Sequence, residues 1–359
     1  MESTITDIVK TYKYLGVQLS SRRLTNLYTT HFKQVLQRAE RRLHCIRHYG
    51  FHKDGLRVET AVRMYKLLVR PILEYGAQVL IYRNYFLSSK SRQSCGIIEL
   101  TAHEKKLENF QTQSLKRLLN CQRYVPPAIV RLFAGVEPLI ARLDFLKLRY
   151  YWRLLKTNQK SFSKRVYDIR KRDLLSSNKG FLHEALNLCS KYKTIDIWHG
   201  RCRRNINPLR WIKQVVVKHN LNKDLNASRK KSCSFSILFL KNPFIYQKTY
   251  HILEPFLQVR HFSSSNARSR FLKALLDTCS FTHTCDFCGK SFHDLLQHQL
   301  FNCSRLTRER TKLFSTIQPH ISKSSIVTPL TDKHIFFAKS LTCKHILKPF
   351  TDFLQSVNY

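Results

Sequence analysis

Acidic side chains are scarce in this sequence. Its 23 Asp and Glu residues stand against 63 Lys and Arg residues, and the formal net charge is +40 over 359 residues. Like charges at this density repel one another and oppose folding unless a polyanion neutralises them. The imbalance therefore favours DNA, RNA or an anionic membrane surface as a partner. Apolar residues make up 43% of the chain, which is normal for a globular protein and argues against a disordered polycation.

Long apolar runs are also missing. Runs such as residues 237–240 are far too short to cross a bilayer, so the sequence predicts no membrane partner. The first residues include Glu2 and Asp7 and lack the apolar segment of a signal peptide, so we expect a nuclear or cytoplasmic protein that is not secreted. The 11 cysteines mostly stand alone within apolar patterns and form no disulfide framework, which agrees with a reducing compartment.

A short run in the last third of the chain has the spacing of a metal site. Its pattern is C-x2-C-x9-H-x4-C, and its residues are Cys285, Cys288, His298 and Cys303. Two thiolates one turn apart can bind one side of Zn²⁺, and a His and a Cys about one helical turn apart can complete a tetrahedron. Residues 289–292 supply a turn and one apolar side chain, and a short helix from about Leu295 would carry the histidine. His283 and His293 are alternatives for the histidine ligand.

Parts of the same run resemble a zinc finger with two cysteines and two histidines. Nine residues separate Cys288 from His298, where that finger has twelve. The finger helix would lose about a turn, so we do not expect it to read bases.

The first 156 residues have the pattern of a strand followed by a helical bundle. Residues 11–19 are rich in β-formers and predict a strand. Apolar residues then recur at helical spacing, with capping threonines, prolines and glycines at the ends. The predicted helices cover about 29–50, 56–71 with Pro71 ending or kinking it, 102–120, 126–135 and 138–154.

Basic residues lie together on one face of the first of these helices. Arg38, Arg41 and Arg42 lie opposite its apolar positions and are predicted to contact nucleic acid, although a solvated helix surface is the plainer interpretation. The remaining candidates for nucleic-acid contact are Arg201, Arg203, Arg204, Lys230 and Lys231. The cluster at 201–204 also fits a nuclear-import signal.

Several segments resemble one family in order and spacing. Residues 12–17 (YKYLGV) resemble the strand that closes the palm in reverse transcriptases of non-LTR retrotransposons, of the jockey-like and related groups. The segments 65–77 (YKLLVRPILEYGA) and 107–119 (LENFQTQSLKRLL) are similar to the central thumb helix and the helix beyond it. Residues 126–139 fit the next element. The metal-site run, followed by Arg308 and Arg310, resembles the cysteine-rich C-terminal end of these proteins.

The resemblance implies that the chain derives from a polymerase but lacks the polymerase active site. That site needs an aromatic-x-Asp-Asp box to hold two metal ions. No Asp-Asp pair occurs in this sequence, which begins after the point where the box would lie. We therefore expect no RNA-directed DNA polymerase activity from this chain. Two alternatives remain open, namely a host DNA-binding regulator with a single atypical zinc finger and a basic structural protein of a ribonucleoprotein.

These patterns together predict a mainly α protein with a helical thumb-like bundle, a short N-terminal strand, a basic middle region and a small zinc knuckle. The predicted domains are 1–156 for the end of the palm and the thumb, 157–265 for a basic region of unknown fold, 266–314 for a helix and the zinc knuckle, and 315–359 for a tail. The expected partners are RNA and DNA, as template–primer or as target DNA.

Overall fold

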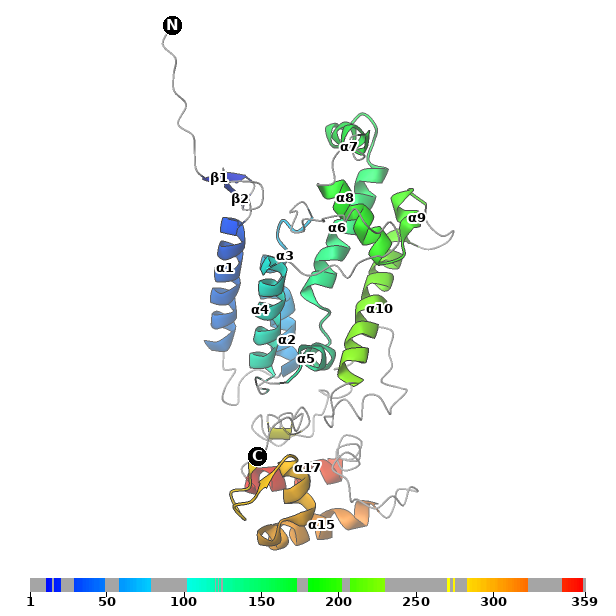
Figure 1. Cartoon of the computed structure of the whole chain (residues 1–359). Helices are drawn as coiled ribbons and strands as arrows, with labels where there is room; N and C mark the ends of the chain where they lie inside the picture. The colour runs from blue at the N-terminus through cyan, green and yellow to red at the C-terminus, as the bar shows by residue number, and fades with distance from the viewer. Residues whose placement is uncertain are drawn as a thin grey trace. The chain divides into compact units, whose positions relative to one another are not determined.

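A computed structural model of the chain is mainly helical, with a short β-hairpin near its N-terminus, which confirms the predicted fold class (Figure 1). The structure describes residues 11–14, 16–20, 29–48, 58–78, 102–119, 121, 123, 125–172, 180–201, 207–229, 270–271, 274, 283–321 and 344–357. None of the helices within these ranges is long and apolar enough to span a membrane.

The β-structure predicted for residues 11–19 is present as two strands instead of one. Strands β1 (Thr11–Tyr14) and β2 (Val17–Ser20) pair antiparallel. The chain reverses at Gly16, whose φ of +81° is a conformation that glycine adopts without steric cost. A Cβ atom on Gly16 would also lie 2.9 Å from the hydroxyl of Tyr75, so a side chain there would displace the Tyr75 ring.

The helices predicted in the first 156 residues are all present. Their bounds are α1 (Thr29–His48), α2 (Val58–Met64), the π-helical turn η2 (Tyr65–Val69), α3 (Arg70–Glu74), α4 (Ala102–Leu118), α5 (Pro127–Ala134) and α6 (Leu139–Lys156). Pro71 does not end its helix, because the widened turn η2 lies just before it and the helix continues as α3. Gly135 caps α5 in the left-handed conformation, as predicted. The predicted stop at Gly50 lies outside the described residues.

The middle region, for which the sequence predicted no fold, contains four further helical segments among its described residues. These are α7 (Phe162–Arg172), α8 (Phe181–Lys191), α9 (Ile195–Trp198) and α10 (Pro208–Arg229). Helix α6 packs against α7 and α8. Buried polar contacts join α6 to α8 and the residue after it. Lys147 forms an ion pair with Glu184, and Asp144 accepts hydrogen bonds of 2.7 Å from Lys191 and from the hydroxyl of Tyr192.

The C-terminal part of the chain forms a small hairpin followed by helices. The elements are β3 (His283–Thr284), β4 (Ser291–Phe292), α14 (Leu295–Gln297), the π-helical turn η5 (His298–Asn302), the 3-10 turn η6 (Ser304–Leu306), α15 (Thr307–Ile321) and α17 (Lys344–Ser356). Helices α15 and α17 pack together, and Leu313, Ile317 and Phe350 are among their buried residues. This apolar contact supports the segment that follows the predicted metal site.

By its internal contacts the chain divides into two compact units, each made of several segments. One comprises Met1–Cys45, Tyr65–Gln111 and Pro138–His219, and the other comprises Ile46–Met64, Thr112–Glu137 and Asn220–Tyr359. In the second unit, Arg131 of α5 binds both carboxylate oxygens of Asp224 in α10, at 2.9 and 2.5 Å. The predicted domain boundaries at 156, 265 and 314 divide the chain differently and stay a prediction.

Candidate metal centre

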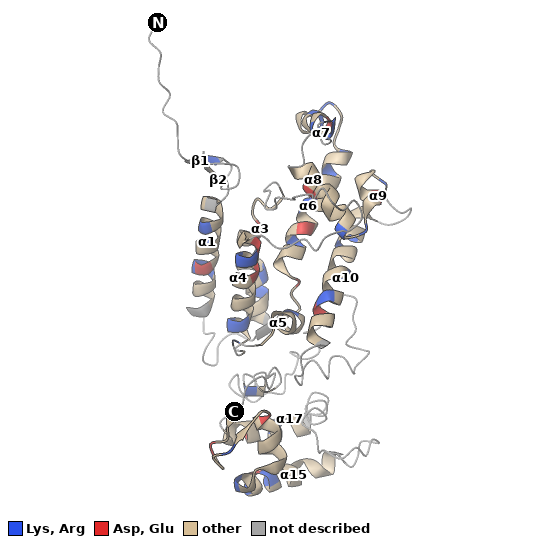
Figure 2. Cartoon of the chain, viewed as in Figure 1, with Lys and Arg blue, Asp and Glu red and all other residues tan. Residues whose placement is uncertain are grey.

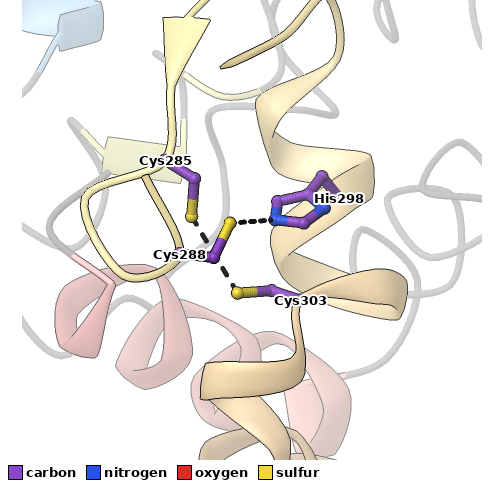
Figure 3. Close-up of side chains that lie close together, drawn as sticks. All are labelled: Cys285, Cys288, His298 and Cys303. Atoms are coloured by element: carbon purple, nitrogen blue, oxygen red, sulfur yellow. Dashed lines mark hydrogen bonds between the residues drawn. The ribbon is translucent and has the colours of Figure 1, made fainter. Parts of the chain in front are cut away.

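The β3–β4 hairpin positions the first two cysteines. The Cys285 N–H donates to the carbonyl of Lys290 at 2.9 Å, and the Gly289 N–H donates to the carbonyl of Cys285 at 2.8 Å. Gly289 has a φ of +69°, which lets the chain turn tightly between these two bonds. The turn brings Cys288 back to the side of the hairpin on which Cys285 lies (Figure 3).

A short helix and a π-helical turn position the other two residues. The Asp294 carboxylate accepts the N–H of Gln297 at 3.0 Å and so caps α14. His298 then begins η5, and the Cys303 N–H donates to the carbonyl of His298 at 2.8 Å. Residues five apart in an α-helix point about 140° away from each other. The wider π-helical turn reduces this angle, so the x4 spacing places His298 and Cys303 on one side.

Four ligand atoms therefore meet between the hairpin and the helix (Figure 3). The sulfur atoms of Cys285 and Cys303 lie 3.9 Å apart, and the Cys288 sulfur lies 3.2 Å from Nε2 of His298. All four atoms lie within 4.8 Å of one another, so the cluster can hold a metal ion. We call these four residues the cysteine–histidine cluster. It contains His298 and neither of the alternatives, His283 and His293.

Backbone amides face the sulfur atoms of the cluster. Burial would raise the pKa of the Cys285 thiol, but hydrogen bonds from the backbone N–H groups of Cys288 and Phe287 and from neighbouring thiols bring this pKa below its usual value. The pKa of Cys303 is raised, first by burial, although the N–H of Arg305 acts in the opposite direction. Amide donors of this kind stabilise thiolates, which are the form that binds metal.

The histidine is held in its neutral form. Burial lowers the pKa of His298, and the positive charges of Arg310 and Lys290 lower it further. A neutral imidazole keeps a lone pair for a metal ion. The Phe292 ring stacks on the imidazole with the centroids 3.5 Å apart. The sequence predicted Phe292 as an apolar residue of the turn but did not predict this stack. Asp294 was also missed, although an Asp just before a helix is a common capping signal.

The other predicted contact residues are only partly described. Arg38, Arg41 and Arg42 are exposed on α1, opposite its buried apolar residues, but Glu40 shares the exposed side. Arg201 is exposed after α9. Arg203, Arg204, Lys230 and Lys231 lie outside the described residues. Figure 2 shows that basic residues occur on α1, α4, α7, α10 and α15, so α1 is not unusual in carrying them.

Helix α15 carries a second basic surface, which was not predicted from the sequence. Its exposed side chains are basic, hydroxyl-bearing or otherwise uncharged, and we call this set the outer face of α15. The basic and hydroxyl-bearing members are Thr307, Arg308, Thr311, Lys312, Ser315 and Thr316. The acidic residue of this helix, Glu309, is half-buried. The turn η6, with the exposed Arg305, joins this helix directly to Cys303. Helical spacing of these residue types was the signal available in the sequence.

Comparisons with protein-family models, with curated proteins and with solved structures found no match to this chain.

Proposed function

We propose that the cysteine–histidine cluster is a structural zinc site. A tetrahedral zinc ion with Zn–S bonds of about 2.3 Å holds two sulfurs about 3.8 Å apart. The Cys285 and Cys303 sulfurs are 3.9 Å apart, which supports this assignment. A sulfur and an imidazole nitrogen on the same ion lie about 3.6 Å apart, close to the 3.2 Å between Cys288 and His298. Four protein ligands leave no open position for a substrate, which is typical of a structural site.

The positive charges near the cluster agree with a bound zinc ion and three thiolates. Three thiolates and one Zn²⁺ carry a net charge of about −1. The positive charges of Arg310 and Lys290 act on His298 and offset this charge. When bound, zinc would tie the β3–β4 hairpin, which carries Cys285 and Cys288, to His298 of η5 and to Cys303 directly after it. A segment this small has little apolar core of its own, so metal binding would contribute much of its folding free energy.

The function that we propose for the chain is nucleic-acid binding, and the observation that carries it is the outer face of α15. A helix surface with cations and hydroxyls and without an exposed acid suits a run of phosphates. Thr307, Thr311 and Ser315 already donate to carbonyls along the chain. Contact with phosphate oxygens therefore falls mainly to Arg308 and Lys312. The net charge of +40 adds a sequence-independent attraction to any polyanion.

We further propose that the chain is the C-terminal part of a non-LTR retrotransposon reverse transcriptase polyprotein, intracellular, lacking the polymerase site and binding RNA and DNA. The support is the order of the motifs and their positions on helices, since the thumb-like segments fall on η2, α3 and α4. A host regulator that reads bases needs a helix long enough to enter the major groove. Helix α14 (Leu295–Gln297) and η5 (His298–Asn302) together make only about two helical turns, and His298 is a proposed metal ligand, which favours the retroelement proposal over the regulator.

Metal content tests the site. Purified protein should contain about one zinc per chain by elemental analysis. Cys288→Ser should lose the metal, whereas Cys45→Ser, which replaces an exposed cysteine of α1, should keep it. Full zinc content in a variant with both Cys285→Ser and Cys288→Ser would disprove the site.

Salt-dependent binding to short duplexes tests the function. We expect affinity to fall steeply between roughly 50 and 200 mM salt, because bound phosphates release counterions. Replacing Arg305, Arg308 and Lys312 together with Gln should reduce the log–log slope by up to about three units, equally on duplexes of different sequence. A second variant tests the face of α1 in the same way, with Gln in place of Arg38, Arg41 and Arg42.

A matched control separates a binding surface from overall charge. Arg63, Lys105 and Lys106 are exposed on α2 and α4, and their triple Gln variant removes the same charge. If this control weakens binding as much as the Arg305, Arg308 and Lys312 variant does, η6 and the outer face of α15 are not the binding surface. A loss that depends on the duplex sequence would favour the host regulator instead.

A further inference from the structure

Helix α7 turns a stripe of apolar side chains away from the protein. Phe162 is 76% exposed, Val166 40% and Ile169 49%. At about 100° per residue these three lie within an arc of about 60° on the helix surface. Tyr167, on roughly the opposite side, is 4% exposed. A helix on a protein surface normally buries its apolar side, so this arrangement is inverted.

Contacts with α6 hold α7 in this orientation. The Tyr167 hydroxyl lies 3.4 Å from that of Tyr151, a buried residue of α6. Lys164 places its ammonium group 4.5 Å from the centroid of the Tyr167 ring and pairs with Asp168 at 3.3 Å. Lys171 lies 5.9 Å from the same centroid. Lys164 is thus directed to the inner side of the helix and Lys171 stays exposed, while the apolar stripe lies on the outer side.

The outer residues have the spacing of a coiled-coil seam. Phe162, Val166 and Ile169 are separated by four and then three residues, which is the d–a–d pattern of a heptad repeat. The flanking e and g positions are then Ser163, Arg165, Arg170 and Arg172, and all four are exposed. Side chains at e and g select the partner helix by charge.

We propose that α7 is a docking site for an amphipathic helix of another protein, with apolar residues in its seam and acidic residues at its flanks. A second copy of this chain does not fit, because its arginines would face Arg165, Arg170 and Arg172 across the seam. Nucleic acid fits the stripe less well, since Phe162 alone offers a flat ring for stacking, and Val166 and Ile169 neither bind phosphate nor stack on bases. A membrane surface requires a wider apolar arc than about 60°. This proposal goes beyond nucleic-acid binding and does not depend on it.

Peptides of known sequence test the proposal with the full chain. The probe is a synthetic peptide of about three heptads with Leu at a and d and Glu at e and g. One control peptide carries Lys in place of Glu, and another has the composition of the probe with its heptad order scrambled. By fluorescence anisotropy we expect the probe to bind at least about tenfold more tightly than either control. Equal binding of the scrambled peptide would show attraction by net charge alone and overturn the proposal, as would no binding of the probe.

Two sets of variants locate the site. Val166→Ser with Ile169→Ser should weaken the probe about tenfold without changing the circular dichroism spectrum, because both side chains are exposed. Replacing Arg165, Arg170 and Arg172 with Glu should reverse the preference toward the Lys peptide. The same charge change at Arg63, Lys105 and Lys106 should leave the preference unchanged. Stronger effects of the serine variants on phosphatidylserine vesicles or on single-stranded DNA than on the probe would assign the stripe to those ligands and overturn the proposal.

Discussion

The ring of Phe292 lies almost parallel to the imidazole of His298, with the centroids 3.5 Å apart and the planes at 13°. Phe292 ends the β3–β4 hairpin, and His298 begins η5. The stack therefore joins the two elements that supply the ligand atoms of the cysteine–histidine cluster. Because a flat ring against the imidazole restricts its rotation, Phe292 keeps Nε2 directed toward Cys288.

Phe292→Ala should lower the metal affinity about tenfold, since residues that orient a ligand typically contribute 10- to 100-fold. Competition with a chelating dye measures this affinity. Phe287→Ala is the matched control, because Phe287 lies in the same hairpin but is 38% exposed. Unchanged affinity in Phe292→Ala would mean that the backbone alone fixes the imidazole.

The cluster could be predicted from the sequence because all of its determinants are local. The turn around Gly289 and the x4 spacing between His298 and Cys303 lie within one short segment, so spacing alone indicates which residues meet. The stack of Phe292 on His298 was not predictable in this way, because it depends on how the hairpin packs against η5. The outer face of α15 was missed for a different reason, since the helical spacing of its basic and hydroxyl-bearing residues is also typical of an ordinary solvated helix surface.

The buried ion pair between Lys147 and Glu184 should dominate the stability of the contact between α6 and α8. The side chains are 2% and 1% exposed. Glu184→Gln removes the carboxylate that pairs with the buried Lys147 ammonium group and should lower the free energy of unfolding by about 3–5 kcal/mol. Chemical denaturation followed by circular dichroism measures the change.

Two further variants show whether the loss of stability in Glu184→Gln comes from the buried charge that remains. Lys147→Met combined with Glu184→Leu removes both charges, so it should be less destabilising than Glu184→Gln. Asp168→Asn breaks the i,i+4 pair between Lys164 and the exposed Asp168 on α7 and should cost only about 0.3–0.5 kcal/mol. A loss in Glu184→Gln as small as this would contradict the assigned role of the buried pair.

The fold was predictable where sequence signals mark both ends of an element. Pro126 and Gly135 flank α5, and the helix lies between them. The hairpin at Gly16 was predicted as one strand, because its β-forming residues run on both sides of the glycine and only a positive φ reverses the chain. Helix α8 was not predicted, because its position depends on the ion pair between Glu184 and Lys147, which lie 37 residues apart in the chain. Such a pairing leaves no local pattern.

His31 connects α1 to the N-terminal hairpin and should make stability depend on pH. The side chain is 2% exposed, and its Nδ1 accepts the backbone N–H of Gln18 at 3.4 Å. Burial lowers the pKa of His31, the positive charge of Arg38 lowers it further, and a hydrogen bond to the backbone of Tyr75 opposes these effects. The folded state therefore holds His31 neutral at pH values where the unfolded chain already binds a proton.

Stability should accordingly be complete above the unfolded value of about 6.5 and should decline as the pH falls through 6.5 toward the lower pKa of the folded state. We expect the midpoint of thermal unfolding to fall between about pH 7.5 and 5.5, and to fall less in His31→Gln, whose amide can still accept the Gln18 N–H. Acid also displaces metal from the cysteine–histidine cluster, but the difference between His31→Gln and the unaltered protein cancels that effect. His44→Gln, at an exposed position of α1, controls for the loss of one imidazole. An identical pH dependence in His31→Gln and in the unaltered protein would show that His31 does not couple folding to protonation.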